Sequence, residues 1–262
     1  MHGDQALACK VMAESGLNVQ YAKDGYAMQR GFVSGDALRT LQNHVDRFIQ
    51  EVVPTMPPEH VFFEDKSDRS TLKQLQQMGL HDTWFDNLFT KGPFRSLAEQ
   101  LLGARVIPKN MQFFNKPPGV GQATPPHQGG FYFKLDPCEA LTMWFALEDV
   151  DEENGCVRYV RGSHQLGMRE HGRTQTLGFS QGIIDFPQGG DTANEVAFPA
   201  QAGDLLVHDA LTIHRAEGNR SITRSRRALG FIYYSEHARE DLGAHRAYQQ
   251  RLAKELKASG KI

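Results

Sequence analysis

The positions of apolar and polar residues divide the 262-residue chain into two parts with different periodicities. In roughly the first hundred residues, apolar side chains recur every three or four positions, which is typical of amphipathic helices. Beyond residue 103, short apolar segments alternate with connections that contain Pro and Gly, which is typical of strands in a sandwich or barrel. The pattern therefore predicts a β core preceded by a mainly helical region.

The helical region carries clear start and stop signals. Ser34 is a typical N-cap residue for the first long helix, and Gly103 is a typical C-terminal stop for the last one. The elements that we predict in this region are a strand at Gly25–Gly31 and helices at Ser34–Val53, Asp82–Phe89 and Phe94–Leu102.

The second part contains several short candidate strands. They are Ala104–Lys116, Gly130–Leu135, Ala140–Leu147, Cys156–Arg161, Glu195–Phe198, Asp204–Val207 and Arg227–Tyr234. The connection Gln165–Thr192 has a loop-like composition, and its length suits a lid. We expect one domain over residues 1–262, with a helical N-terminal part (1–103), a β core (104–235) and a C-terminal helix (239–258).

Composition and charge narrow the classes of function. Lys and Arg number 29 against 31 Asp and Glu, for a net charge of −2, which argues against nucleic acid or a membrane surface as the partner. No stretch approaches the roughly 18 apolar residues of a membrane span, and charged residues interrupt the N-terminal segment where a signal peptide would lie, so we expect a cytoplasmic protein. Three cysteines do not suit a disulfide framework, whereas 11 histidines suggest a search for a histidine metal site.

Two histidines lie in contexts that suit a metal site. His127 occurs in T-P-P-H-Q-G-G-F-Y-F, and His214 occurs much later in L-T-I-H-R. Two imidazoles and one carboxylate commonly hold a mononuclear iron(II) ion, with the first histidine and the carboxylate two positions apart on one strand. The corresponding position in this chain is Gly129, so the carboxylate is missing.

Five motifs occur in order along the chain. They are F-F-N-K-P-P-G (Phe113–Gly119), H-Q-G (His127–Gly129), D-E-E-N-G-C-V-R-Y-V-R-G-S-H (Asp151–His164), G-D-L-L-V-H (Gly203–His208) and H-R-A-E-G-N-R-S…R-R-A-L (His214–Leu229). Together they resemble the phytanoyl-CoA dioxygenase family of Fe(II)/2-oxoglutarate oxygenases over nearly the whole chain. The resemblance implies a mainly β fold with helices, the double-stranded β-helix or jelly roll. It also implies Fe(II), 2-oxoglutarate and O2 as cofactors and a small molecule as substrate.

Carried over residue by residue, the resemblance assigns roles to five side chains. His127 and His214 match the iron ligands, and Arg226 matches the residue that binds the distal carboxylate of 2-oxoglutarate. A guanidinium suits that task because it can hold a carboxylate through two hydrogen bonds. Lys116 and Trp144 match positions that contact 2-oxoglutarate in family members.

The choice of Arg226 leaves neighbouring arginines as alternatives. The spacing from His214 is also compatible with Arg224 or Arg227 as the residue that binds the distal carboxylate of 2-oxoglutarate. Strand alternation places Arg226 on one face with Ala228 and Gly230, which favours Arg226 beside small residues inside the core.

Gly129 departs from the family pattern, and three interpretations compete. In the first, chloride or bromide takes the place of the carboxylate, because either halide carries the same charge and glycine leaves room for it; such sites resemble Fe(II)/2-oxoglutarate halogenases. In the second, the chain is a hydroxylase that has lost its ligand, in nature or by engineering. In the third, it is a non-catalytic relative that binds 2-oxoglutarate or nothing. Asp136 or Asp209 is a conceivable substitute ligand, without a spacing argument for either.

Other polar residues have simpler interpretations. His208 is the nearest rival ligand, because it shares strand parity with His214, but we expect it to pack beside the site. His164 is expected to organise a turn. Five arginines near the predicted lid raise the hypothesis of an anionic or zwitterionic substrate, against the alternative of solvated surface charges: Arg158, Arg161, Arg169, Arg173 and Arg215.

Overall fold

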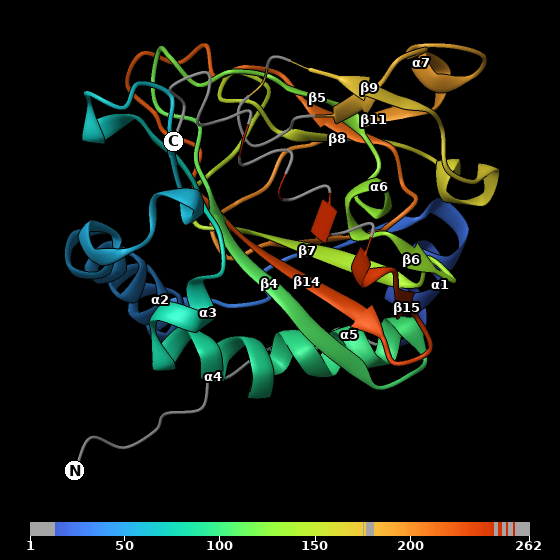
Figure 1. Ribbon diagram of the computed structural model, residues 1–262, viewed down its shortest axis with the longest axis horizontal. Helices are drawn as coiled ribbons and strands as arrows, with labels where there is room; N and C mark the ends of the chain where they lie inside the picture. The colour runs from blue at the N-terminus through green and yellow to red at the C-terminus, as the bar shows by residue number, and fades with distance from the viewer. Residues whose placement is uncertain are drawn as a thin grey trace.

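The structure is a computed structural model that describes residues 14–174, 176, 181–243, 246, 247, 250 and 254 (Figure 1). Its helices are α1 (Glu14–Asp24), α2 (Gly35–Arg47), α3 (Met78–His81), α4 (Thr83–Lys91), α5 (Pro93–Leu102), α6 (Gly130–Phe133) and α7 (Asp191–Asn194). Short 3-10 turns lie at Pro58–His60, Arg69–Thr71 and Ser163–Leu166.

The strands form antiparallel sheets. They are β1 (Tyr26–Gln29), β2 (Val61–Phe63), β3 (Leu72–Leu75), β4 (Val106–Phe114), β5 (Thr124–His127), β6 (Leu135–Asp136), β7 (Ala140–Ala146), β8 (Val157–Val160), β9 (His171–Arg173), β10 (Gln181–Ile183), β11 (Glu195–Phe198), β12 (Leu205–Asp209), β13 (His214–Ala216), β14 (Ala228–Ser235) and β15 (Arg239–Glu240). The large sheet has the order β1-β12-β7-β14-β4-β3-β2, and the small sheet has the order β11-β8-β13-β5. This arrangement confirms the prediction of a mainly β fold with helices.

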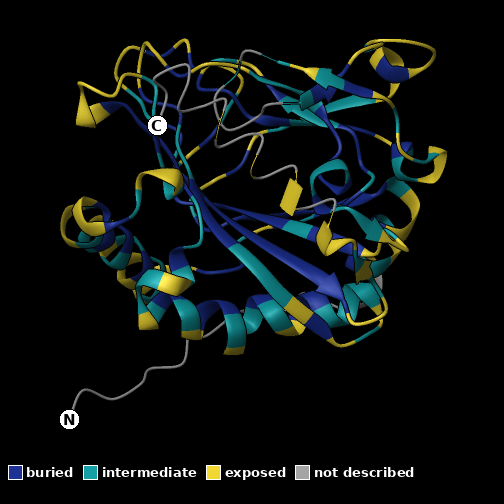
Figure 2. Cartoon of the chain, in the orientation of Figure 1, coloured by how far each residue is buried: buried dark blue, intermediate teal, exposed yellow. Residues whose placement is uncertain are grey.

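Helices cover the outer face of the large sheet, and the small sheet lies on its other side. Figure 1 shows α4 and α5 running beneath β4 and β14, with β5, β8 and β11 above them. Alternation along β14 explains the layers: Leu229 and Phe231 belong to the cluster on the helix side, whereas Ala228 packs with Trp144 between the two sheets. Figure 2 shows β14 of the large sheet in the colour of buried residues along its length, whereas the neighbouring β4 is only partly buried.

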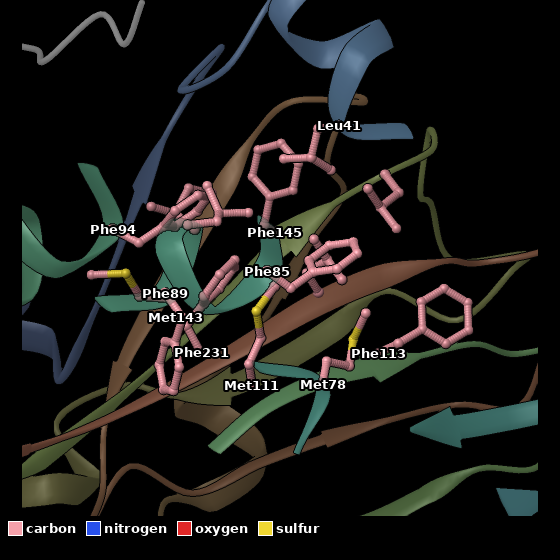
Figure 3. Packing of buried hydrophobic residues seen from close by; sticks show 14 of the residues in the cluster. Leu41, Met78, Phe85, Phe89, Phe94, Met111, Phe113, Met143, Phe145 and Phe231 are labelled. Atoms are coloured by element: carbon pink, nitrogen blue, oxygen red, sulfur yellow. The ribbon is translucent and has the colours of Figure 1, made fainter. Parts of the chain in front are cut away.

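Aromatic packing joins α5 to the large sheet. Phe94 stacks on Phe231 with 4.0 Å between ring centroids, and it meets Phe145 edge to face at 5.7 Å. Figure 3 shows these three residues within the same buried cluster. All three side chains are fully buried, so each contributes its apolar area to the core.

The predicted helices of the first part are confirmed. Ser34 is the N-cap residue of α2, although its side chain makes no capping hydrogen bond, and a π-helical turn (Phe48–Val52) and a 3-10 turn (Val53–Thr55) prolong the helix. Asp82 caps α4 by accepting the Trp84 N–H at 3.0 Å. Gly103 ends α5 with a φ of 63°. The same part also contributes β1, β2 and β3 to the large sheet.

The predictions for the second part need two corrections. Gly130–Leu135 was predicted as a strand, but Gly130–Phe133 forms the helical turn α6. The chain turns here because the Gly130 N–H donates to the Ala210 carbonyl at 2.8 Å, and a Cβ on Gly130 would lie 2.5 Å from the Cys138 Sγ. The predicted loop Gln165–Thr192 contains β9, β10 and the start of α7.

The remaining strand predictions agree with β4, β7, β8, β11, β12 and β14. Arg239 and Glu240, where the C-terminal helix was predicted to begin, instead form β15 and pair with β6. Most of the rest of that predicted helix lies outside the described residues. Among the residues that the structure describes, no helix is long and apolar enough to cross a bilayer.

Candidate metal and co-substrate site

The fold brings the two predicted iron ligands together. His127 ends β5, and His214 begins β13, and the two residues are direct partners in the antiparallel pairing of these strands. Their ring centroids are 4.1 Å apart. His127 is buried, while His214 keeps some exposure. The small sheet therefore presents two adjacent imidazoles from segments that are far apart in the sequence.

Backbone carbonyl groups orient both imidazoles. The Nδ1 of His127 lies 2.8 Å from the Pro125 carbonyl oxygen, and the Nδ1 of His214 lies 2.9 Å from the Thr212 carbonyl oxygen. Because a carbonyl oxygen only accepts, each Nδ1 carries the proton, and each Nε2 carries the lone pair. Burial lowers the pKa of both histidines well below its usual value. Neutral imidazoles that present Nε2 are suitable donors for a divalent transition metal.

Gly129 is not required by the backbone conformation. Its φ of −57° and ψ of −37° are ordinary helical values that any residue can adopt. A Cβ at this position would lie 3.3 Å from Cζ and 3.5 Å from Cε2 of Phe133. The Phe133 ring is itself buried and packs against Tyr234, with 5.1 Å between centroids. The Phe133 ring therefore borders the space that a side chain at 129 would enter.

Neither proposed substitute carboxylate accompanies the two histidines. Asp136 is exposed on β6, and the Asp209 carboxylate accepts the Leu211 N–H at 2.8 Å and contacts the Tyr21 hydroxyl at 3.4 Å. Across the described residues, no group of three or more His, Cys, Asp or Glu side chains is arranged to hold a metal ion. The described part of the site thus offers two histidine donors and no carboxylate.

His208 packs against His214 and joins it to a buried aromatic group. The two ring centroids are 4.2 Å apart, and the His208 Nδ1 lies 3.0 Å from the Tyr159 hydroxyl oxygen. Burial lowers the pKa of His208 to about 3, so the ring is neutral. Tyr159 in turn stacks on Tyr26 at 4.8 Å. These contacts support the interpretation of His208 as a packing residue beside the site.

Arg226 is buried without a carboxylate partner. Its Nε has no hydrogen-bond partner, and within the described ranges its guanidinium forms no ion pair. The Arg226 Cζ lies 5.4 Å from the centroid of the Trp144 ring, a cation–π geometry. Burial lowers the pKa of Arg226 to about 10, which still leaves it charged at neutral pH. A buried cation without a partner is costly, so the geometry favours an anionic ligand at this point.

The two alternative arginines are already neutralised by the protein. Arg224 binds Asp151 at 2.8 Å and Glu153 at 2.6 Å. Arg227 likewise binds Glu148 at 2.6 Å, and it also reaches Asp46 on α2 at 2.7 Å.

Lys116 lies next to Arg226. The backbones of the two residues exchange hydrogen bonds of 3.2 Å in both directions, which continues the pairing of β4 with β14. The Lys116 ammonium donates to the Gln122 carbonyl oxygen and lies 3.4 Å from the Thr124 Oγ1. Burial, followed by the neighbouring Arg226 charge, lowers the pKa of Lys116 well below its usual value. Lys116 and Trp144 therefore each lie beside Arg226, and their shared role in binding one co-substrate stays a prediction.

The arginines near the predicted lid are mostly engaged in ion pairs. Arg158 pairs with Glu152 and Glu195, Arg169 with Asp185 and Asp191, and Arg215 with Glu195 and Glu217. Because these charges are neutralised inside the protein, they give no support to the hypothesis of an anionic substrate.

Sequence reasoning missed Phe133. In the strand that was predicted for Gly130–Leu135, residues 129 and 133 would lie far apart along the strand axis. In the helical turn, residues four positions apart lie on the same face, so a side chain at 129 would meet that of Phe133. The signal that could have revealed this turn is the Gly129-Gly130 pair, because paired glycines are typical of turns.

The chain is similar to known proteins in sequence and in fold. Residues 21–228 match the family described as phytanoyl-CoA dioxygenase (PhyH). A phytanoyl-CoA dioxygenase of Arabidopsis thaliana is 26% identical over 257 residues, covering 85% of this chain and 87% of that protein. Phytanoyl-CoA dioxygenase 1 of Oryza sativa subsp. japonica is 30% identical over 180 residues, covering 64% of this chain and 63% of that protein.

Solved structures share the fold at lower identity. The epimerase SnoN, in a complex with Fe3+, alpha ketoglutarate and nogalamycin RO, superposes with a TM-score of 0.70 at 23% identity, covering 87% of this chain and 85% of its own. EctD from S. alaskensis in its apoform superposes with a TM-score of 0.70 at 17% identity, covering 92% of this chain and 82% of its own.

Proposed function

The chain belongs to the phytanoyl-CoA dioxygenase family of Fe(II)/2-oxoglutarate-dependent oxygenases, and from that premise we propose that it functionalises an aliphatic C–H bond of a small molecule at an iron site held by two imidazoles. The observation that carries the proposal is the adjacent pair of Nε2-presenting histidines in the same core as a buried arginine without a carboxylate. The proposal of a small-molecule substrate follows the similarity to a phytanoyl-CoA dioxygenase and to SnoN, whose structure holds nogalamycin RO.

The residues present fit the cofactor and co-substrate of the family. His127 and His214 would hold Fe(II) through Nε2, and the Nδ1 hydrogen bonds to backbone carbonyls keep both rings in place. Arg226 would bind the distal carboxylate of 2-oxoglutarate, and Trp144 and Lys116 would shape its pocket. When bound, iron and 2-oxoglutarate supply the activation of O2 for C–H oxidation. The protein's own contribution is position and the exclusion of water by buried side chains.

We further propose that chloride or bromide binds beside Gly129 as the third, non-protein ligand. Fe²⁺ with one carboxylate and dianionic 2-oxoglutarate has a net charge of −1, and a halide in place of the carboxylate leaves that sum unchanged. Glycine places no side chain in this space, and the Phe133 ring that borders it offers no competing donor atom to the metal. An apolar border of this kind suits a monoanion that needs few hydrogen bonds. The product would then be a halogenated compound.

Hydroxylation is the second candidate function. The observation that favours it is the similarity to curated phytanoyl-CoA dioxygenases over 85% and 64% of the chain. In that case water would fill the position beside Gly129, and the product would carry a hydroxyl group.

Anaerobic titration tests the iron site. Fe(II) and 2-oxoglutarate added to the protein should produce a visible metal-to-ligand charge-transfer band, and the His214→Ala variant should not form it. Leu80→Ala is the matched control, because this side chain is 75% exposed on α3. A wild-type protein that shows no band under saturating conditions would contradict the proposed iron enzyme and would support a non-catalytic relative.

Bromide distinguishes the two candidate functions. Crystals of the anaerobic Fe(II)/2-oxoglutarate complex, soaked in bromide, should show a bromine anomalous peak beside Gly129. The double variant Gly129→Asp/Phe133→Leu should remove that peak. The smaller leucine makes room for the carboxylate, which then takes the position of bromide. An oxygen scatterer in place of bromide would refute the halide proposal and would support hydroxylation.

A further inference from the structure

The side chain of Gln128 connects three separate segments of the chain. Gln128 is completely buried. Its Nε2 donates to the Gly167 carbonyl oxygen at 2.9 Å and to the Leu211 carbonyl oxygen at 2.7 Å, and its Oε1 accepts the Arg169 N–H at 2.8 Å. One amide group therefore joins β5, the loop before β13 and the lid segment, which comprises the described parts of residues 165–192.

These partners determine the orientation of the amide. Both carbonyl oxygens can only accept, and the Arg169 N–H can only donate. A flipped Gln128 amide would place its oxygen against two acceptors and its nitrogen against a donor. Only glutamine supplies this combination of two donors and one acceptor at the required length.

His171 adds a second connection to the same residue. Its Nε2 accepts the backbone N–H of Gln128 at 3.1 Å, and its Nδ1 donates to the Arg169 carbonyl oxygen at 2.9 Å. The His171 ring also stacks on Phe131 with 4.3 Å between centroids. The lid segment thus contacts both the side chain and the backbone of Gln128.

The Leu211 contact reaches the loop that positions the second histidine. Leu211 lies between Ala210, whose carbonyl oxygen accepts the Gly130 N–H at 2.8 Å, and Thr212, whose carbonyl oxygen holds the His214 Nδ1 at 2.9 Å. A shift of this loop would therefore move the acceptor that orients His214.

We infer that Gln128 is a positioning residue that couples the lid segment to the loops carrying both site histidines. It follows His127 directly, and through Leu211 it connects to the backbone that holds His214. Loss of its hydrogen bonds would loosen the lid segment and change the relative placement of the two imidazoles together. The metal-binding consequence rests on the proposed function, whereas the connection among the three segments does not.

Hydrogen exchange and metal binding, measured on the same variants, test this inference. In Gln128→Ala the amides of peptides covering 165–174 and 209–216 should exchange at least tenfold faster, because all three side-chain hydrogen bonds are lost. The dissociation constant for Fe(II), measured by anaerobic calorimetry, should rise about 10- to 100-fold, the range typical for groups that orient metal ligands.

A second variant changes the lid segment and leaves residue 128 unaltered. His171→Phe keeps the ring stack on Phe131 but removes the acceptor for the Gln128 N–H. It should raise exchange in the distant peptide 209–216 as well as in 165–174, with a smaller loss of Fe(II) affinity. Gln188→Ala is the matched control, because Gln188 lies in the lid segment and, among the described residues, its exposed side-chain amide donates to Asp185 alone. It should change neither readout.

Two results would overturn the inference. Faster exchange confined to 165–174, with 209–216 unchanged in both variants, would show that the segments are not coupled. Unchanged Fe(II) affinity in Gln128→Ala would show that the lid segment does not influence the histidines. A wild-type protein that binds no Fe(II) would contradict the proposed function instead. Hydrogen exchange at 209–216 would then test by itself whether Gln128 couples the three segments.

Discussion

The two main sheets of this molecule are stabilised in different ways. The large sheet packs its outer face against α4 and α5 through many fully buried apolar side chains, such as Phe94, Phe145 and Phe231. The small sheet contributes fewer buried apolar side chains, such as Val157 and Tyr159, and it and the lid segment also form individual polar contacts, such as those of Gln128 and the ion pairs of Arg215. Stability is therefore shared among many residues in one sheet, whereas the chemistry depends on single residues near the other.

The difference shows where substitutions should affect folding and where they should affect binding. An apolar cluster loses free energy in proportion to the atoms removed and the cavity left behind. A polar contact near the site contributes little to the overall stability, but it determines the position of a functional group. Four substitutions with expected effects of decreasing size test this division.

Removal of an aromatic ring from the helix side of the large sheet should have the largest effect. Phe94→Ala deletes a ring that stacks on Phe231 at 4.0 Å and is fully buried. We expect the free energy of unfolding to fall by about 3–5 kcal/mol, as for other buried Phe→Ala changes. Urea denaturation measures the change. The control Leu80→Ala, at a side chain that is 75% exposed, should stay within about 0.5 kcal/mol of wild type.

Removal of the Arg226 charge should weaken the binding of 2-oxoglutarate without lowering the free energy of unfolding. In Arg226→Met the dissociation constant for 2-oxoglutarate should rise about 30-fold or more, because truncating one partner of a buried charge pair costs about 2–5 kcal/mol. The free energy of unfolding should stay equal or increase, since the lost guanidinium forms no ion pair in the described structure and its Nε has no hydrogen-bond partner, while methionine can still pack on the Trp144 ring. Anaerobic calorimetry and urea denaturation measure the two quantities.

Arg224→Met is the control for the second prediction. Arg224 binds Asp151 and Glu153 at the surface, so its loss should change the affinity for 2-oxoglutarate less than about threefold. Equal weakening by both substitutions would mean that Arg226 does not hold the co-substrate.

The sequence predicted the parts of the fold that have a local pattern. The helices α2, α4 and α5 follow from apolar periodicity and from terminal signals such as Asp82 and Gly103, and β14 follows from a continuous apolar run. The short strand β3 carries the polar residues Lys73 and Gln74 and has no alternating pattern, so its pairing with β2 and β4 makes it a strand.

The candidate site was predictable in its residue types but not in its surroundings. The motifs around His127, His214 and Arg226 indicated which side chains to examine, because those residues lie in recognisable segments. One feature arises only when distant segments meet, namely that the Arg226 guanidinium is buried without an ion pair among the described residues. The Phe133 ring beside Gly129 is local, and it was missed because the helical turn at Gly130–Phe133 was predicted as a strand.

A methyl group at position 129 should produce a moderate effect that depends on Phe133. In Gly129→Ala the new Cβ would lie 3.3 Å from the Phe133 Cζ, and the backbone itself can accept alanine. We expect a loss of about 1 kcal/mol in the free energy of unfolding, the lower end for overpacking. In a Phe133→Leu background the same change should cost less, by about 0.5 kcal/mol or more. Strictly additive effects in urea denaturation would contradict the contact.

The smallest effect is expected at an ion pair of the small sheet. Glu195 on β11 accepts from Arg215 at 2.6 Å and lies 3.5 Å from Arg158, but both arginines are partly exposed. Ion pairs that solvent reaches contribute less than about 1 kcal/mol, so Glu195→Gln should lower the free energy of unfolding by no more than that. The difference from wild type should shrink in about 1 M salt, where screening is strong. A loss as large as that of Phe94→Ala would mean that polar contacts also dominate the stability of the small sheet, and the contrast between the two sheets would then be wrong.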